Sequence, residues 1–87
     1  MSDKIVLEYA FKDFLTAVAF INEVARVAEE ADHHPDIHLT SYKNLRLELS
    51  THSAGGKVTQ KDRELAAKIE SLLIGRTDVS AKSTSKR

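Results

Sequence analysis

The chain contains no cysteine and no tryptophan, one proline, three glycines and only 6% aromatic residues. Without cysteine, disulfide bonds, thiolate metal sites and cysteine nucleophiles are excluded. The 13 basic and 13 acidic side chains give zero formal net charge. This argues against nucleic acid or a membrane as the main partner, because both favour a basic excess. The longest mainly apolar stretch, Phe14 to Ile21, is too short to span a bilayer, and the N-terminus does not resemble a signal peptide. We therefore expect a cytoplasmic protein.

The length of 87 residues corresponds to a single domain. A chain of this size buries a modest fraction of its surface and has a thin core. Association of identical subunits would add stability, so we expect a homo-oligomer, either a dimer or a tetramer.

Hydrophobic periodicity divides the first half of the chain into a strand and a helix. Apolar residues alternate from Lys4 to Phe11, which predicts a strand. From Phe14 to about Ala31 they recur at helical spacing, behind Asp13 as a candidate N-cap, which predicts an amphipathic helix. Pro35 disfavours the α conformation at the residue before it, so this helix should end at or just before His33-His34.

The middle of the chain has the pattern of a hairpin. An extended segment, Ile37 to Tyr42, leads through a turn near Lys43–Asn44 into a second strand. In that strand Leu45, Leu47 and Leu49 alternate with polar residues, which is typical of a half-buried antiparallel sheet. Thr51 and His52 are expected at its end.

A second helix is predicted to begin after Thr59, since Thr59 and Asp62 have the spacing of a capping box with Asp in place of Glu. Gly75 fits the position that ends it. Residues 1–75 then form an α+β domain in the order strand, helix, strand, strand, helix, with two helices on one face of an antiparallel sheet. Residues 76–87 are rich in Ser, Thr and Lys and are predicted to be a disordered polar tail.

All four histidines lie between Asp32 and His52. His33 and His34 follow the first helix and His52 closes the last strand, so they would converge if helix ends and strand ends meet along one rim. Histidine exchanges protons near neutral pH, and two imidazoles in different environments can serve as acid and base in one site.

Two other interpretations of these residues stay open. A His pair at a helix C-terminus can simply interact with the last carbonyls and the helix dipole, and Asp62 can be a purely structural cap. Zinc is a further possibility, with ligands drawn from His33, His34, His38, His52 and Asp62. Against a metal, Pro35 separates His34 from His38, so these two cannot share a helical face as in an HExxH motif. His38 itself is expected on the surface.

The spacing of several polar residues resembles the signature of the pterin-4a-carbinolamine dehydratases. In order, the matching residues are Glu29, His33-His34-Pro35, the aromatic Tyr42, His52, and Asp62 at the start of the next helix. The segments Phe11-Lys12-Asp13-Phe14 and Leu49-Ser50-Thr51-His52 are also similar to that family. The resemblance covers residues 4 to 74. Typical members begin with a further helix and strand that this chain lacks, which implies a thinner sheet.

The resemblance implies dehydration of a 4a-hydroxytetrahydropterin, such as 4a-hydroxytetrahydrobiopterin, to the quinonoid dihydropterin, with no metal and no redox cofactor. It implies that His33 and His52 are the acid and base and that His34 belongs to the same catalytic set. The substrate-binding residues that it implies are His33, His34, Pro35, Thr51, His52, Ser53 and Ala54. Glu29, one helical turn before His33, is expected to orient that imidazole, with Asp62 as a second supporting residue. The alternative is a non-catalytic dimerisation or transcriptional-cofactor module with the same fold.

Overall fold

The computed structural model describes residues 4–51, 55–74, 76 and 79–86. Strand β1 spans Ile5–Phe11 and is followed by helix α1, Phe14–Ala31. A hairpin of β2, Asp36–Thr40, and β3, Asn44–Leu49, leads to helix α2, Gln60–Ser71, and strand β4, Val79–Lys86.

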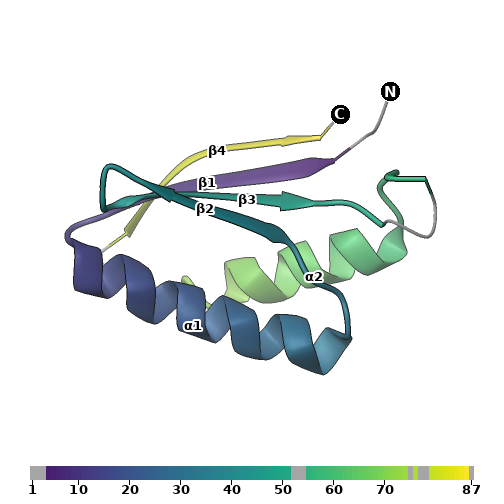
Figure 1. Cartoon of the computed structure of the whole chain (residues 1–87), viewed down its shortest axis with the longest axis horizontal. Helices are drawn as coiled ribbons and strands as arrows, with labels where there is room; N and C mark the ends of the chain where they lie inside the picture. The colour runs from purple at the N-terminus through teal and green to yellow at the C-terminus, as the bar shows by residue number, and fades with distance from the viewer. Residues whose placement is uncertain (1–3, 52–54, 75, 77–78, 87) are drawn as a thin grey trace.

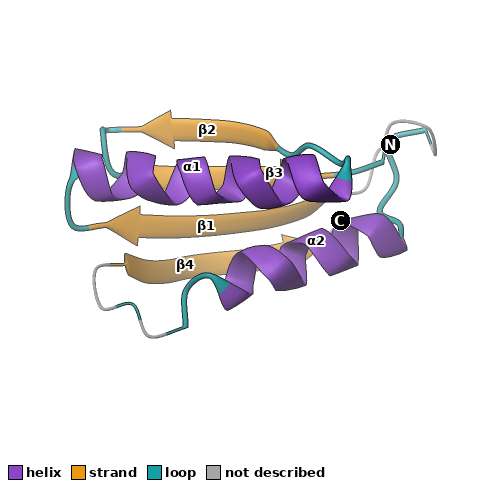
Figure 2. Ribbon diagram, turned by 90° about the horizontal axis from the view of Figure 1, so that it is seen from below, coloured by secondary structure: helices purple, strands orange, loops and turns teal. Residues whose placement is uncertain are grey.

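The strands form one antiparallel sheet in the order β2-β3-β1-β4. Both helices lie against the same face of this sheet, α1 beside α2 (Figures 1 and 2). The predicted α+β class, with two helices on one face of an antiparallel sheet, is confirmed. No helix of the described residues lies over the other face of the sheet in either view.

Helix α1 has the predicted bounds. Asp13 is in an extended conformation in front of it, and its Oδ1 accepts a hydrogen bond from the backbone N–H of Thr16 at 2.8 Å. This bond satisfies one of the free N–H groups of the first turn. Phe20 and Val24 are fully buried on the face that meets the sheet, as the helical spacing of apolar residues requires.

The core lies between the sheet and the helices and follows the two-residue period of the strands. In β1 and β3 the alternate apolar residues that were predicted to face one side are all buried, at Ile5, Leu7, Tyr9, Phe11, Leu45, Leu47 and Leu49. Helix α2 contributes Leu65 and Ile69 to the same cluster. None of the helices in the described part of the chain is long and apolar enough to cross a membrane.

Strand β4 was not expected from the sequence. Residues 76–87 were predicted to be a disordered tail, and this is wrong for Val79–Lys86, which pair with β1 from Phe11↔Val79 to Ile5↔Lys86. The register shifts between Glu8 and Tyr9, as at a β-bulge. The polar composition of this segment did not predict a strand. An edge strand can nevertheless be held by backbone hydrogen bonds with little apolar burial. In the described part of the chain the sheet therefore has four strands, where the resemblance implied a thinner one.

The boundaries of the other elements differ slightly from the prediction. Strand β2 ends at Thr40, and the chain reverses at Ser41 and Tyr42, which both have positive φ. Helix α2 begins after Thr59 as expected but ends at Ser71. Gly75 was predicted to end this helix, and it lies outside the residues that the structure describes.

Candidate active site

Helix α1 ends in a way that fixes the position of the first histidine. Asp32 adopts a left-handed conformation (φ 50°) and its N–H bonds to the carbonyls of Ala28 and Glu29, while the N–H of His33 bonds to the carbonyl of Ala28 at 3.1 Å. These are the bonds of a Schellman motif, and Asp tolerates the left-handed region better than most residues. His33 is thereby anchored directly beyond the helix.

His33 contacts a carboxylate on the other helix. Its Nε2 lies 2.6 Å from Oδ1 of Asp62, in the first turn of α2. The side chain of Asp62 is fully buried and that of His33 is 11% exposed. A carboxylate buried in this way needs hydrogen-bond donors, and the imidazole is one of them.

The second oxygen of Asp62 is held from two other segments. Oδ2 accepts from the hydroxyl of Thr51 and from the backbone N–H of Thr59, each at 2.8 Å, and the two Thr hydroxyls lie 2.7 Å apart. Burial favours a higher pKa for Asp62, but the hydrogen bonds from His33, Thr59 and Thr51 outweigh it and hold the pKa below its usual value. Asp62 is therefore ionised near neutral pH.

Asp62 makes two kinds of contact. It completes the predicted capping box with Thr59, and it contacts His33. With an ionised acceptor at 2.6 Å, the proton of this contact belongs to His33 Nε2. The other ring nitrogen, Nδ1, is then the one that can accept or release a proton.

Glu29 was expected to orient His33, and the structure shows a different pairing. Oε2 of Glu29 lies 2.5 Å from Nε2 of His34. The carboxylate that contacts His33 is that of Asp62. Both members of the Glu29–His34 pair are exposed, at 75% and 58% of their side chains. The sequence separation suggested Glu29 for His33, but the left-handed turn at Asp32 moves His33 off the helical path.

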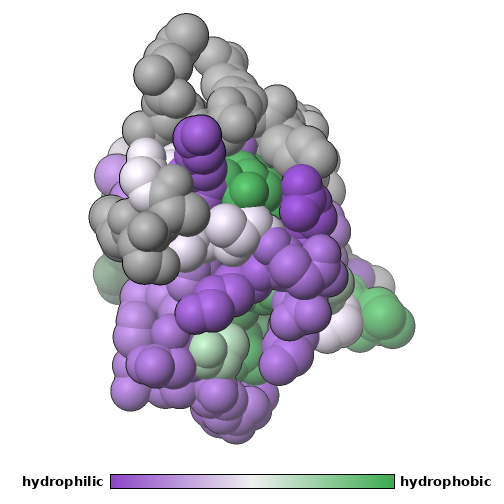
Figure 3. All heavy atoms as spheres, turned by 90° about the vertical axis from the view of Figure 1, so that its right-hand side faces the viewer, coloured by the Kyte–Doolittle hydropathy of each residue, from purple (hydrophilic) through white to green (hydrophobic). Residues whose placement is uncertain are grey.

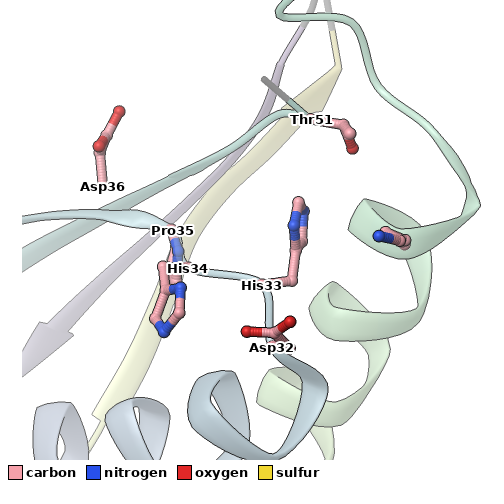
Figure 4. A pocket seen from close by; sticks show the side chains of 7 residues that line it. Asp32, His33, His34, Pro35, Asp36 and Thr51 are labelled. Atoms are coloured by element: carbon pink, nitrogen blue, oxygen red, sulfur yellow. The ribbon is translucent and has the colours of Figure 1, made fainter. Parts of the chain in front are cut away.

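A pocket of about 380 Å³ opens beside these residues. Four predicted site residues line it, namely His33, His34, Pro35 and Thr51, together with Asp32, Asp36 and Lys61. In Figure 4, His33 stands between Thr51 and Asp32, with His34 and Pro35 beside it. The pocket lies at the end of the molecule where α1 ends and α2 begins (Figure 1).

Three of the predicted site residues, His52, Ser53 and Ala54, lie outside the residues that the structure describes. Thr51, the residue before His52 in the sequence, lines the pocket. In the part of the chain that the structure describes, no group of three or more His, Asp or Glu side chains is arranged to hold a metal ion.

Two residues that the sequence analysis considered lie elsewhere. His38 is on β2, half-exposed, with its Nε2 3.9 Å from Oε2 of Glu48, in agreement with its prediction as a surface residue. Tyr42, one of the residues that carried the family resemblance, is 59% exposed in the turn between β2 and β3.

Sequence reasoning missed Asp32, Asp36 and Lys61 as pocket residues and Thr59 as a partner of Thr51. Asp32 and Asp36 flank the His33-His34-Pro35 run, and Lys61 precedes Asp62. Adjacency to the motif residues was the signal that could have identified them.

The geometry is suited to acid–base chemistry on a small molecule. A buried ionised carboxylate fixes one nitrogen of an imidazole at the wall of an open pocket, which leaves the other nitrogen for proton transfer. A carboxylate that orients an imidazole in this way also stabilises its protonated form.

Comparisons with known proteins agree with this description. The family model described as pterin 4 alpha carbinolamine dehydratase matches residues 1–72. A protein of Gloeobacter violaceus, provisionally named pterin-4-alpha-carbinolamine dehydratase 2, is 59% identical over 59 residues, which are 68% of this chain and 62% of that protein. The chain thus spans less than two thirds of that relative's length.

Two solved structures share the fold. A protein described as a transcriptional coactivator/pterin dehydratase from Brucella melitensis is 38% identical, with a TM-score of 0.72 over 79% of this chain and 71% of its own. A pterin dehydratase-like protein described as a RuBisCO assembly factor in the alpha-carboxysome is 21% identical, with a TM-score of 0.65 over 79% of this chain and 77% of its own. The second likeness concerns the fold alone.

Proposed function

Because the chain belongs to the pterin-4-alpha-carbinolamine dehydratase family, we propose that it removes water from a 4a-hydroxytetrahydropterin. The product is the quinonoid dihydropterin, and the substrate we expect is of the 4a-hydroxytetrahydrobiopterin type. The observation that carries this proposal is the contact between His33 and the buried Asp62 at the wall of the pocket.

The reaction needs two proton transfers and no electron acceptor. The C4a–O bond breaks as the N5 lone pair forms the N5=C4a double bond. The departing hydroxyl gains a proton and leaves as water, and N5 loses its proton. Each positioned proton transfer typically contributes about 10²–10⁴-fold to the rate.

We assign one of these transfers to His33 and the other to His52. Asp62 keeps the proton of His33 on Nε2 and stabilises the imidazolium, so Nδ1 exchanges protons with the substrate. The placement of Thr51 in the pocket supports the assignment of His52, since the two residues are consecutive.

The remaining site residues are proposed to bind the pterin ring. His34 and Pro35 form one wall of the pocket and Thr51 another. Ser53 and Ala54 are assigned to the same binding set because they continue from Thr51 and His52. Glu29 supports His34 through their contact, and Asp62 supports His33.

A dehydration assay on a synthetic 4a-hydroxytetrahydropterin tests the proposal. His33→Ala and His52→Ala should each lower kcat by about 10²–10⁴-fold. His38→Ala is the matched control, because His38 is a half-exposed histidine that does not line this pocket. Circular dichroism should show all three variants folded. Wild-type kcat in both His33→Ala and His52→Ala would refute the assignment.

A non-catalytic binding role is the second candidate. It is favoured by the description of the Brucella melitensis relative as a transcriptional coactivator. Large apolar side chains exposed on this chain, among them Phe14, Leu15, Ile37 and Tyr42, offer a surface for it. Absence of dehydration together with partner capture that survives His33→Ala would support this role over catalysis.

We also propose that the protein is a homo-oligomer, a dimer or a tetramer. The same exposed apolar residues and the two edge strands, β2 and β4, leave surface that a second copy can cover. Light scattering coupled to size exclusion measures the subunit number directly, and a monomer at all micromolar concentrations would contradict this.

A further inference from the structure

Among the residues that the structure describes, those lining the pocket include more carboxylates than ammonium groups. Two carboxylates line it, Asp32 and Asp36, against the single ammonium group of Lys61. Neither Asp32 nor Asp36 forms an ion pair with any residue that the structure describes. Their charges are therefore not neutralised by a specific partner in the described part of the chain.

Two further carboxylates adjoin the pocket through its histidines. Asp62 contacts His33 and Glu29 contacts His34. Among the described residues, these four carboxylates outnumber Lys61 and the imidazoles of His33 and His34 together, so this described group is net negative even when both imidazoles are protonated. The space-filling view of this end of the molecule shows hydrophilic residues over most of its described surface (Figure 3).

The pterin ring gains positive charge during dehydration, which is opposite in sign to the net charge of the described pocket residues. The starting 4a-hydroxytetrahydropterin has a neutral ring. As the hydroxyl takes a proton and departs, the ring loses a hydroxide equivalent and becomes a cation, with its charge shared between N5 and the pyrimidine nitrogens. That charge disappears only when N5 releases its proton. A negative pocket lowers the energy of a charge that exists only between these two steps.

We propose that Asp32 and Asp36 act as electrostatic residues that stabilise the positive charge developing on the pterin ring. This inference rests on the proposed function, since it concerns the charge that builds up in that reaction. It assigns to two lining carboxylates a role separate from the proton transfers of the histidines. Lys61, at the same pocket, contributes with the opposite sign.

We predict that removing either carboxylate lowers kcat and leaves KM unchanged. A contact made only with the transition state lowers kcat and kcat/KM equally when it is removed. Asp36→Asn should lower both by about threefold to tenfold with KM unchanged, as expected for the loss of one of several charges lining a partly solvated pocket. Asp32→Asn should do the same, and Asn is also tolerated at the left-handed position that ends α1.

A binding measurement without turnover separates this inference from the proposed function. A tetrahydropterin without the 4a-hydroxyl is the probe, because its N5 can be protonated but cannot react. The pocket should raise the pKa of the bound N5 by about half a unit or more, as read from its ultraviolet spectrum, and less at high salt. Asp32→Asn and Asp36→Asn should reduce this shift, and Lys61→Gln should increase it.

Glu70→Gln is the matched control. Glu70 is exposed at the far end of α2, nine residues and about 13 Å from Lys61 along the helix, so its removal changes the net charge but not the pocket. If the bound N5 shows no upward shift, or if all four variants move it equally, the inference is overturned. If the shift is present and wild type dehydrates no pterin, the proposed function fails while the electrostatic preference of the pocket stands.

Discussion

His33 and Asp62, 29 positions apart in the sequence, meet with Nε2 of the imidazole 2.6 Å from Oδ1 of the carboxylate. Each residue is fixed by a helix terminus. His33 is the residue after the left-handed Asp32 that ends α1, and Asp62 is in the capping box that begins α2. Two local signals in the sequence, one that ends a helix and one that starts another, therefore build a single contact at the pocket.

Replacing Asp62 by Asn tests the role of its charge. The amide keeps the shape of the side chain and one acceptor oxygen, but it cannot stabilise an imidazolium. We expect kcat to fall by about 10²-fold or more, since the charge acts on the proton-transferring group. Nitrogen chemical shifts of His33 should show a single Nε2–H tautomer in wild type and a mixture in the variant. Unchanged kcat and an unchanged tautomer would contradict the role assigned to Asp62.

The stability of the protein should depend on pH through Asp62. Its hydrogen bonds hold its pKa in the folded state below the usual value of about 3.9, although burial acts in the opposite direction. The resulting stabilisation is complete above the unfolded-state pKa and is lost as the pH falls through the folded-state pKa. Urea unfolding should therefore be measured at several pH values between 6 and 2. As the pH falls, the free energy of unfolding should decrease less for Asp62→Asn than for wild type. Parallel curves for the two proteins would contradict this expectation.

Glu29→Gln should have much smaller effects. Its contact with His34 lies in solvent, where ion pairs contribute about 0–1 kcal/mol. We expect a change in unfolding free energy within about 0.5 kcal/mol and a smaller loss of kcat than in Asp62→Asn. A larger loss of activity for Glu29→Gln than for Asp62→Asn would mean that the exposed pair, and not the buried one, matters for catalysis.

The pairing of β4 can be tested by proline substitution. Ser83 and Thr84 are opposite Glu8 and Leu7 of β1. Alternate residues of an edge strand direct their N–H groups to the neighbouring strand, so replacing two consecutive residues by proline removes at least one inter-strand bond. In this double variant the amide protons of β1 that bond to β4 should exchange faster. The matched control is the double alanine variant, and equal exchange in the two would show that β4 does not pair.

The predictable part of the fold came from periodicity and from caps. Alternating leucines fixed the buried face of β3, and the spacing from Phe14 to Ala31 fixed the bounds of α1. Both patterns arise because burial of apolar area selects one face of an element. Strand β4 could not be found in this way, since of its residues only Val79 is a large apolar side chain, and a strand at the edge of a sheet can form through its backbone.

Of the predicted site histidines, His33 and His34 line the pocket, whereas His52 lies outside the residues that the structure describes. His33 and Thr51, which the family resemblance assigned to one site, line the same pocket. Which carboxylate meets which imidazole depends on the path of the chain after α1. The left-handed turn at Asp32 brings His33 to Asp62 and leaves Glu29 beside His34. Glu29 and His33 are separated by one helical turn in the sequence. This separation does not show that the backbone leaves the helical path between them.

The family model ends at residue 72, whereas the sheet is completed by Val79–Lys86. A version of this protein trimmed to the matched segment would keep every pocket residue described above but would leave one side of β1 with unpaired backbone groups. An unpaired strand edge is a template for pairing with other chains. Anyone shortening the protein for crystallisation or assay should therefore expect self-association or precipitation, and should retain the last strand.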